Sequence, residues 1–354
     1  MSTICAVTQS SSALLLDPRH LRGPVIRDIR KSVELLDLRS CVLSGLSQPR
    51  KAIPSLLLWD EQGLENFNEW TRCPHYYPKS KEIEILETCN DKIAAAMPHK
   101  SSIVELGCGN LHKTSVILSA LAKQKKEVHY YALDVSQSAL LNNLQALQEE
   151  FKCFPKISIS GLLGTYDDCV DWISNNDATL HALPVTFLWV GNSVANLSKS
   201  EASNLMAGFR QACSVARIDC RFLVSADACA DEGKLTKAYN PESGSSRTFL
   251  RHGLNHVNRL FNTDLFDGAT WNCTVEYDRE ENEVLAFYFP VIDVTFPIDD
   301  TGSVTVHQGE HIFFFRSGKW NQEQMGTVAR QSGFQVSRVW RDLDEEYGFY
   351  FLTP

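Results

Sequence analysis

The stretch that most constrains the fold is residues 103–110 (IVELGCGN), a short apolar run that ends in two glycines. This pattern is typical of a strand followed by a tight turn, where glycine lets the backbone approach a ligand closely. About 25 residues later, residues 128–135 (VHYYALDV) resemble a second strand, with Asp134 at its end. In α/β folds this spacing places a carboxylate where it can bind a ribose. The two segments therefore suggest a nucleotide-like cofactor, with a plain packed strand-to-helix connection as the alternative.

The glycine turn leaves two cofactor classes open, because NAD-dependent dehydrogenases and S-adenosyl-L-methionine (SAM) methyltransferases share this arrangement. The third glycine of the dinucleotide fingerprint G-x-G-x-x-G is missing, since His112 occupies its position. Close approach of the helix to a pyrophosphate is therefore not specified. Glu105, just before the glycines, adds a polar group suited to a ligand with a cationic amino-acid end. Both details favour SAM.

Strand-like and helical segments alternate after residue 81, which predicts a doubly wound α/β domain. The expected strands are 101–107, 128–135, 157–163, 185–190 and 220–226, and the expected helices are 82–95, 112–124, 137–152, 167–175 and 200–216. A helical region at 233–261, with a loop at 240–246, then precedes strand-like alternation at 273–279, 283–295, 303–308 and 311–316. The chain ends with an expected helix at 321–332 and strands at 334–341 and 348–353.

The N-terminal part is less regular. Residues 1–25 show no firm periodicity and are expected to be loosely ordered, whereas residues 25–46 carry apolar positions at helical spacing and predict an amphipathic first helix. Residues 54–60 and 66–78 are rich in aromatic side chains. They suit either a layer that packs on the core or a lid over a flat substrate.

Composition narrows the possible partners of the 354-residue chain. A net charge of −9 argues against nucleic acid, which requires a basic face. No stretch approaches the ~18 apolar residues of a membrane span, and we expect a monomeric cytoplasmic enzyme. The eleven cysteines show no C-x-x-C spacing. His252 and His256 lie one helical turn apart but lack an evident third ligand, so we expect no metal site.

Several separated motifs resemble one family, the SAM-dependent amino-acid α-N-methyltransferases. This family is typified by the histidine N-methyltransferase of ergothioneine biosynthesis and by the dimethylallyltryptophan N-methyltransferases of alkaloid pathways. The resemblance extends from about residue 53 to the C-terminus. It rests on WDxxGxxxF (59–67), HYYP (75–78), VELGCGNxxKT (104–114), LDVSxSAL (133–140), GLLGTYDD (161–168), GNSVANL (191–197), AYN (238–240) and GEHI (309–312).

The resemblance implies a class I methyltransferase fold, in which the last two strands form the reversed terminal hairpin. The SAM-binding domain would comprise residues 81–226 and 317–354. It would be interrupted by an α+β substrate-binding domain at 227–316, to which residues 1–80 contribute. The cofactor would be SAM and the partner a small-molecule amino acid.

The resemblance also assigns site residues. Those assigned to SAM are Tyr76, Gly107, Lys113, Asp134, Thr165 and Tyr166, with Asp134 on the ribose, Tyr166 beside the adenine and Tyr76 closing the pocket. Asn196 would hold the amino-acid head group, and Tyr239, supported by Ser246, would contact the carboxylate. A neutral donor suits a zwitterion's carboxylate, and an acceptor can aim the amine lone pair at the methyl group. Asn196 as a helix cap and Tyr239 as a packed aromatic are the alternatives.

One departure from the family pattern indicates the substrate. Histidine methyltransferases carry a glutamate and, two residues later, a serine that both bind the imidazole. Here Ser317 matches the serine, Phe315 replaces the glutamate, and Trp59 replaces a tyrosine that faces the imidazole. An imidazole N–H without its acceptor would cost ~1–3 kcal/mol, whereas added aromatic surface suits an indole. A register error, which would turn Phe315 to the other face, is the alternative.

We therefore predict transfer of a methyl group to the α-amine of an aromatic amino acid, most simply tryptophan. A prenylated tryptophan is the near alternative and histidine the family rival. The transfer would be an in-line displacement that needs mainly alignment and desolvation, with proton loss to water or through Tyr239. Small neighbours such as Gly191 and Ser193 would leave room for repeated methylation. The rivals from other classes are a catalytically silent SAM-binding partner protein and a dehydrogenase.

Overall fold

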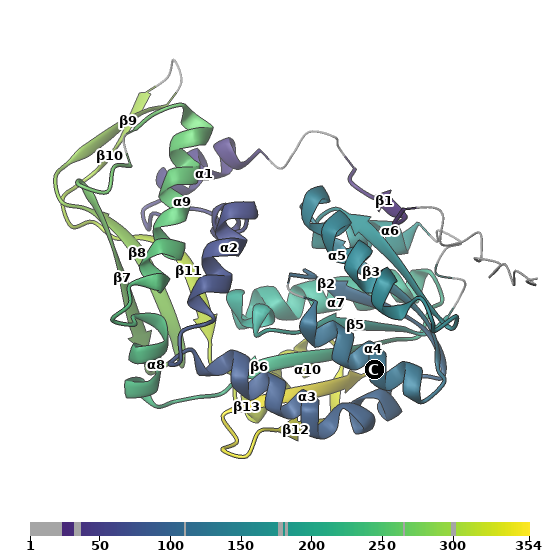
Figure 1. The fold of residues 1–354 in the computed structure, drawn as a ribbon. Helices are drawn as coiled ribbons and strands as arrows, with labels where there is room; N and C mark the ends of the chain where they lie inside the picture. The colour runs from purple at the N-terminus through teal and green to yellow at the C-terminus, as the bar shows by residue number, and fades with distance from the viewer. Residues whose placement is uncertain are drawn as a thin grey trace, which may run out of the picture.

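The computed structural model describes residues 23–31, 37–109, 111–175, 180, 183–264, 266–298 and 302–354. The described chain forms two lobes that lie side by side (Figure 1). The large lobe is built on a long, mostly parallel sheet covered by helices. The described part of the small lobe contains a second, antiparallel sheet, a projecting hairpin, four α-helices and a short 3-10 helix. In the described residues, no helix is both long and apolar enough to cross a membrane.

Eight strands of the described chain form the large sheet, in the order β1-β4-β3-β2-β5-β6-β13-β12. Their bounds are β1 Ile26–Asp28, β2 Lys100–Leu106, β3 Glu127–Asp134, β4 Ile157–Leu163, β5 Val185–Trp189, β6 Cys220–Asp227, β12 Gln335–Arg341 and β13 Tyr347–Thr353. The first six are parallel, whereas β13 runs antiparallel to β6 and β12 antiparallel to β13. This reversed final hairpin confirms the predicted class I topology.

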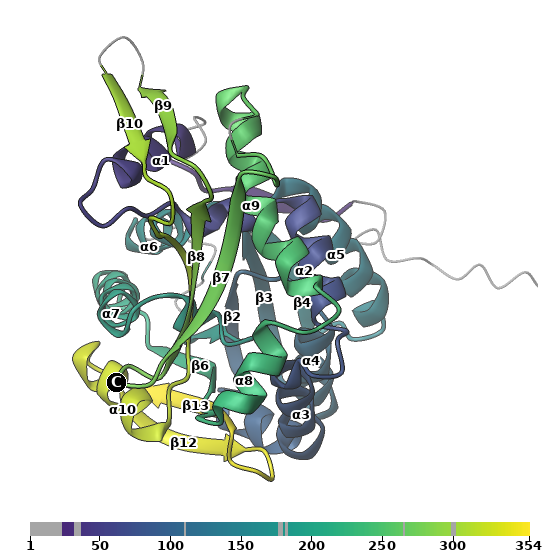
Figure 2. The ribbon, with the colours of Figure 1, turned by 90° about the vertical axis from the view of Figure 1, so that its left-hand side faces the viewer.

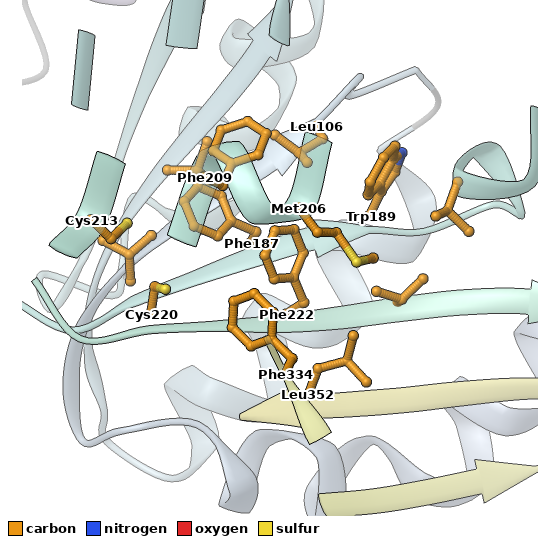
Figure 3. Close-up of a cluster of buried hydrophobic side chains, with 14 of the residues drawn as sticks. Leu106, Phe187, Trp189, Met206, Phe209, Cys213, Cys220, Phe222, Phe334 and Leu352 are labelled. Carbon is orange, nitrogen blue, oxygen red and sulfur yellow. The ribbon is translucent and has the colours of Figure 1, made fainter. Parts of the chain in front are cut away.

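The central strands are apolar on both faces because helices cover both sides of the sheet. Val104 and Leu106 of β2 belong to one buried cluster and Ile103 to the other. In the first cluster, Phe187 of β5 packs against Phe209 at a ring-centroid distance of 4.6 Å and against Phe222 of β6 at 4.9 Å (Figure 3). These rings anchor the strands whose ends carry the candidate site.

The helices of the large lobe connect successive strands, as the alternation predicts. They are α3 Tyr77–Ala96, α4 His112–Lys123, α5 Gln137–Phe151, α6 Tyr166–Ser174, α7 Lys199–Val215 and α10 Gln322–Gln331. Helices α6, α7 and α10 begin with capping boxes at Thr165, Ser198 and Asn321, in which each cap and the third helical residue bond each other's backbone N–H. Side-chain caps fix where these helices start.

The small lobe packs helices against strands β7 Trp271–Asp278, β8 Glu283–Pro290 and β11 Ile312–Gly318. Strands β7 and β8 and helix α9 lie in front of the large sheet in Figure 2. The remaining elements are α1 Leu38–Leu46, η2 Ser55–Leu58, α2 Glu61–Trp70, α8 Glu232–Tyr239, α9 Ser245–Phe261 and the hairpin β9 Val294–Ile298 with β10 Gly302–Val306. Strand β11 has a bulge between Phe313 and Phe315, and the Phe314 ring stacks on Tyr288.

The N-terminal region differs from the expected single helix over residues 25–46. Ile26–Asp28 is a strand that extends the edge of the large sheet beside β4, and a helix forms only at Leu38–Leu46. The helix prediction was therefore wrong for residues 25–31, where Ile26 instead packs against the cluster beneath β4. Residues 1–22 and 32–36, which carry the other N-terminal expectations, lie outside the described residues. The aromatic-rich segment contains helix α2. The Asp60 side chain caps this helix, which packs into the small-lobe core.

Candidate functional site

The glycine turn predicted from the sequence lies at the carboxyl end of β2, next to the end of β3. Gly107 has a φ of +77° and Gly109 a φ of +39°, a region that favours glycine. A Cβ added at Gly107 would lie 3.3 Å from the Tyr166 hydroxyl, so a side chain would fill the space above the turn. Backbone can therefore approach a ligand here as expected.

Asp134 ends β3 beside this turn. One carboxylate oxygen accepts a hydrogen bond from the Ser136 N–H at 3.0 Å, and the other lies 3.6 Å from the Cys108 thiol. Burial raises the pKa of Asp134 above its usual value. A buried carboxylate at the end of this strand, beside the glycine turn, is suited to accept a ribose hydroxyl.

Tyr166 and Thr165 lie at the start of α6, after β4. The Tyr166 ring packs edge-on against Trp189 at 5.7 Å, and its hydroxyl is 3.4 Å from the Leu106 carbonyl. The Thr165 side chain bonds Asp168 at 2.8 Å in the capping box. Tyr166 thus offers its ring to the space beside Gly107, while Thr165 fixes the helix start that carries it.

Lys113 lies at the start of α4 and is held by a buried acid from another helix. Its Nζ is 2.9 Å from the Glu82 carboxylate of α3, which also accepts hydrogen bonds from the Gly191 N–H (2.7 Å) and the Ser225 hydroxyl (2.6 Å). Gly191 has a φ of +80°, and a Cβ there would lie 2.7 Å from the Lys113 Nζ. Glu82 therefore connects the turn after β5 to the expected cofactor lysine.

Glu105 does not face a ligand in the way the sequence suggested. Its carboxylate is buried and accepts hydrogen bonds from the Thr114 hydroxyl at 2.7 Å and from the Tyr130 hydroxyl at 2.5 Å. Burial is the largest influence on its pKa and raises it to about 7. Strand alternation explains the difference, because Glu105 points to the sheet face opposite that of Leu106. Its contacts tie β2 to α4 and β3.

Asn196 lies in the short helix η4 (Ser193–Asn196), after β5. It is half-buried, and no described residue hydrogen-bonds its amide. Asn192, the residue before η4, is instead a structural anchor with a φ of 60°. Its Oδ1 accepts from the Asp227 N–H at 2.9 Å, and its Nδ2 donates to the Ser317 hydroxyl at 3.2 Å. Asn192 thus ties η4 to β6 and β11 and leaves Asn196 available.

Tyr239 ends α8 and lies in a buried polar network with Ser317. Their hydroxyl oxygens are 2.8 Å apart. Lys319, which is fully buried, places its Nζ 2.6 Å from the Tyr239 oxygen, 3.0 Å from the Ser317 oxygen and 2.9 Å from the Asp227 carboxylate. The Tyr77 hydroxyl donates to the same carboxylate at 2.7 Å. Both predicted substrate residues therefore belong to one network at the junction of the lobes.

Aromatic side chains from residues 59–76 and from α9 pack around these polar groups. Trp59 lies 5.1 Å from the Phe249 ring, and Trp70 lies 5.4 Å from Tyr239 and 5.0 Å from Tyr76. Burial raises the pKa of Tyr76 well above its usual value. The aromatic segment thus does pack on the small-lobe core, and it also contacts the two tyrosines assigned to SAM and to the substrate.

Ser246 lies in the first turn of α9, one turn before Phe249. It is fully buried, and no described residue hydrogen-bonds its Oγ. Residues three apart in a helix share a face, so this hydroxyl lies on the face that carries Phe249 into the aromatic group. A buried polar atom without a partner is costly in a protein interior. A ligand hydrogen bond would remove that cost.

Phe315 lies on the inner face of β11 and is only 6% exposed. It pairs with Ala286 and Ser317 pairs with Val284, so the two side chains share one face of the strand. Phe313, across the bulge, lies on the other face, where the Arg316 guanidinium lies 5.6 Å from its ring centroid. The inner face of β11 thus presents Phe315 and Ser317 together.

The two histidines at helical spacing have structural partners. His252 contacts the Asp60 carboxylate, and the His256 Nδ1 is 3.0 Å from the Leu57 carbonyl oxygen. Asp60 also caps α2 and contacts Arg259. Within the part of the chain that the structure describes, no group of three or more His, Cys, Asp or Glu side chains is placed to hold a metal ion. These contacts fix η2 and Trp59 against α9.

Sequence reasoning did not identify the residues that hold the site residues in place. These are Glu82, Asn192, Asp227 and Lys319. One signal was available for Lys319, because it lies two residues after Ser317 and so falls on the same side of an extended chain. Asn192 lies inside the motif GNSVANL (191–197), whereas Glu82 and Asp227 come from distant segments and carry no local signature. Their roles appear only when β5, β6, β11 and α3 meet.

The donor set fits a ligand with a ribose, an aromatic base and an amino-acid end. Gly107 leaves room for the ligand, Asp134 offers a carboxylate, Tyr166 offers a ring, and Lys113 is positioned beside the turn after β5. On the side of the small lobe, Asn196, Tyr239 and the buried Ser246 are polar but uncharged. The arrangement can hold a nucleoside-linked cofactor against a second, zwitterionic molecule.

Comparison with known proteins agrees with this geometry. A family model for histidine-specific, SAM-dependent methyltransferases matches residues 38–354. The N-methyltransferase benX of Aspergillus terreus is 39% identical over 94% of this chain and 93% of its own length. The 4-dimethylallyltryptophan N-methyltransferase easF of Aspergillus fumigatus is 27% identical over 94% of this chain and 98% of its own length. Ergothioneine biosynthesis protein 1 of Neurospora crassa is 30% identical over 93% of this chain, which corresponds to 36% of that protein.

Proposed function

We propose a reaction from the premise that this chain belongs to the family of SAM-dependent, histidine-specific methyltransferases. It is a SAM-dependent N-methyltransferase, like the relatives it matches. We propose that its acceptor is the α-amino group of an aromatic amino acid, with tryptophan as the substrate. 4-Dimethylallyltryptophan is the near alternative. A place in alkaloid biosynthesis, a cytoplasmic location and a monomeric state stay predictions.

The observation that carries the substrate proposal is the inner face of β11. At the position where a histidine enzyme of this family is expected to carry an acidic acceptor, Phe315 presents a buried ring. Trp59, Phe67 and Phe249 lie within 5.4 Å of one another, measured between ring centroids. An indole buries more apolar surface than an imidazole and tolerates this environment better. Histidine would leave a ring N–H without that acceptor.

The chain's own residues would mainly align and desolvate the reactants. When bound, SAM supplies an electrophilic methyl group on a cationic sulfur. Asn196 would accept a hydrogen bond from the substrate amine and aim its lone pair, while Tyr239 would donate to the carboxylate. The aromatic side chains around them would exclude water. Alignment of this kind needs no strong base once the amine is neutral.

Tyr239 is better suited to donate a hydrogen bond than to remove a proton. Burial, together with the nearby Asp227 carboxylate, raises the pKa of its hydroxyl. A neutral phenol keeps its proton at physiological pH. The amine proton would then leave to water, which is the first of the two routes considered from the sequence.

The deciding experiment is SAM turnover with each of the twenty amino acids and with 4-dimethylallyltryptophan, followed by mass spectrometry of the products. Methylation of tryptophan and not of histidine is the expected result, and product masses give the number of methyl groups added. Preference for histidine would overturn the substrate proposal.

Asn196→Ala should lower kcat by about 100-fold while SAM binding by calorimetry is retained, because removing one aligned contact costs about 3 kcal/mol at the transition state. SAM binding without transfer to any amino acid would instead favour a silent partner protein.

A further inference from the structure

We propose that Lys319 is a positioning residue that fixes the Tyr239 hydroxyl as a hydrogen-bond donor toward the substrate carboxylate. The inference rests on the proposed amino-acid substrate and deepens it. It follows from counting donors and acceptors in the buried network formed by Asn192, Asp227, Tyr239, Ser317 and Lys319. In such a network, the positions of the heavy atoms determine which acceptor each hydrogen bonds.

The Lys319 ammonium has three hydrogens and three acceptors among the described residues. Its Nζ lies 2.9 Å from the Asp227 Oδ2, 2.6 Å from the Tyr239 oxygen and 3.0 Å from the Ser317 oxygen. Lys319 and Asp227 are both fully buried. An ammonium can only donate. Lys319 therefore fills one lone pair on Tyr239 and one on Ser317, and has no hydrogen left for a substrate.

Asn192 fills the second lone pair of Ser317. The Asn192 amide is oriented by the Asp227 backbone N–H, which must donate to Oδ1, at 2.9 Å. The Asn192 Nδ2 then faces Ser317 at 3.2 Å and the Gly318 carbonyl at 3.3 Å. With both lone pairs occupied, the Ser317 hydroxyl acts as a donor. Its remaining neighbour is the Tyr239 oxygen, at 2.8 Å.

Tyr239 therefore accepts from both Lys319 and Ser317, and its own hydrogen is not used inside the network. That hydrogen is left for an acceptor outside the network, which in this proposal is the substrate carboxylate. Without Lys319, the Tyr239 hydroxyl could turn inward and donate to Ser317. The lysine thus acts through Tyr239 and makes the site selective for a molecule that carries a carboxylate.

The charge of Lys319 is balanced by Asp227, which also receives the Tyr77 hydroxyl at 2.7 Å and the Cys229 N–H at 3.0 Å. Replacing the lysine alone leaves a buried carboxylate unpaired, which destabilises a fold strongly. The test therefore uses three changes: Lys319→Met, the paired change Lys319→Met with Asp227→Asn, and Ser317→Ala, which alters no charge. Lys123→Met is the matched control, because Lys123 is exposed on α4 and its Nζ contacts the exposed Asp91 at 3.1 Å.

The assay compares tryptophan with tryptamine, which has the same ring and amine but no carboxylate. We expect the lysine variants to raise KM for tryptophan by about 10-fold with a change in kcat below about 3-fold, and Ser317→Ala to raise KM by about 3-fold. The lysine variants should leave KM for tryptamine unchanged, and Ser317→Ala should raise KM for tryptophan more than KM for tryptamine, because any contact of Ser317 with the ring affects both substrates equally. In a Tyr239→Phe background, Lys319→Met should add nothing, because the hydroxyl it acts through is gone.

Equal effects on both substrates, or additive effects of Lys319→Met and Tyr239→Phe, would overturn the inference and leave the proposed function intact. If the unmodified chain methylates no amino acid, the proposed function fails and this inference with it. Circular dichroism and the melting temperature identify a variant that fails to fold. If both lysine variants are unfolded, Ser317→Ala still decides, because an equal rise in KM for tryptophan and for tryptamine would contradict the proposed hydrogen-bond network.

Discussion

Replacing Phe315 by glutamate tests the substrate proposal at the position where this chain departs from the histidine enzymes. Phe315 lies on the inner face of β11, beside Ser317. A carboxylate there restores an acceptor for an imidazole N–H and removes aromatic surface from the indole side. A buried donor left without its acceptor costs about 1–3 kcal/mol, so Phe315→Glu should shift the histidine-to-tryptophan preference by about 5- to 150-fold toward histidine.

The preference is best measured by competition. Equimolar tryptophan and histidine compete for one enzyme preparation, and mass spectrometry gives the ratio of the two methylated products. The matched control is Phe313→Glu, which places the same charge on the opposite face of β11, beside Arg316. This control should leave the ratio unchanged.

Stability has to be checked in parallel, because Phe315 is 6% exposed and a carboxylate at such a position is costly. Removing a buried Phe ring destabilises a fold by about 3–5 kcal/mol. Phe315→Leu keeps an apolar side chain and separates loss of packing from gain of the acid. A folded Phe315→Glu variant with an unchanged product ratio would refute the reasoning that this position selects the side chain.

Three further predictions concern stability and cofactor binding. Burial raises the pKa of the Glu105 carboxyl from 4.5 to about 7, so the contribution of its protonated form to stability is complete below about pH 4.5 and is lost as the pH rises to 7. The free energy of unfolding should therefore fall by about 3 kcal/mol over this pH range, and Glu105→Gln should remove that fall in denaturant titrations. Gly107→Ala should weaken SAM binding by about 10-fold in calorimetry, because φ is +77° and the new Cβ meets Tyr166. The control Gly208→Ala, inside α7, should leave SAM affinity unchanged and raise the free energy of unfolding by about 0.5–1 kcal/mol. Equal SAM affinity in both variants would contradict the glycine argument. Asp60→Asn should lower the free energy of unfolding by about 1–3 kcal/mol in urea, because the Asp60 carboxylate joins α2 to α9, and an unchanged midpoint would mean that this contact is not stabilising.

Local sequence patterns predicted the large lobe well. Residues 157–163 were expected as a strand with these bounds, and the expected helix 200–216 differs by one residue from α7. These elements are long, periodic and bounded by clear caps, so local physics determines them. The topology followed from the resemblance, and the reversed terminal hairpin confirms it.

The failures have physical causes. Ile26 and Ile29 fit a helical period, but pairing with β4 and packing against α5 and α6 place this segment at the sheet edge. Glu105 was assigned to a ligand because its distance in sequence from the glycines is short, whereas strand alternation turns it to the far face. The buried partners Asp227 and Lys319 meet only through tertiary structure. Such contacts between segments 92 residues apart leave no local pattern.

The Asp227–Lys319 contact also bears on how far the small lobe is an exchangeable module. The chain passes from the small lobe into the large lobe at Tyr77, leaves the large lobe after Asp227 and returns at Lys319. These three crossing points meet, because Tyr77 and Lys319 both bond the Asp227 carboxylate. A chimera that grafts this lobe onto another methyltransferase would cut the chain at residues that hold one another. The graft would have to carry Tyr77, Asp227 and Lys319 together. Selection for a new substrate would then act on other residues of the small lobe and leave these three unchanged.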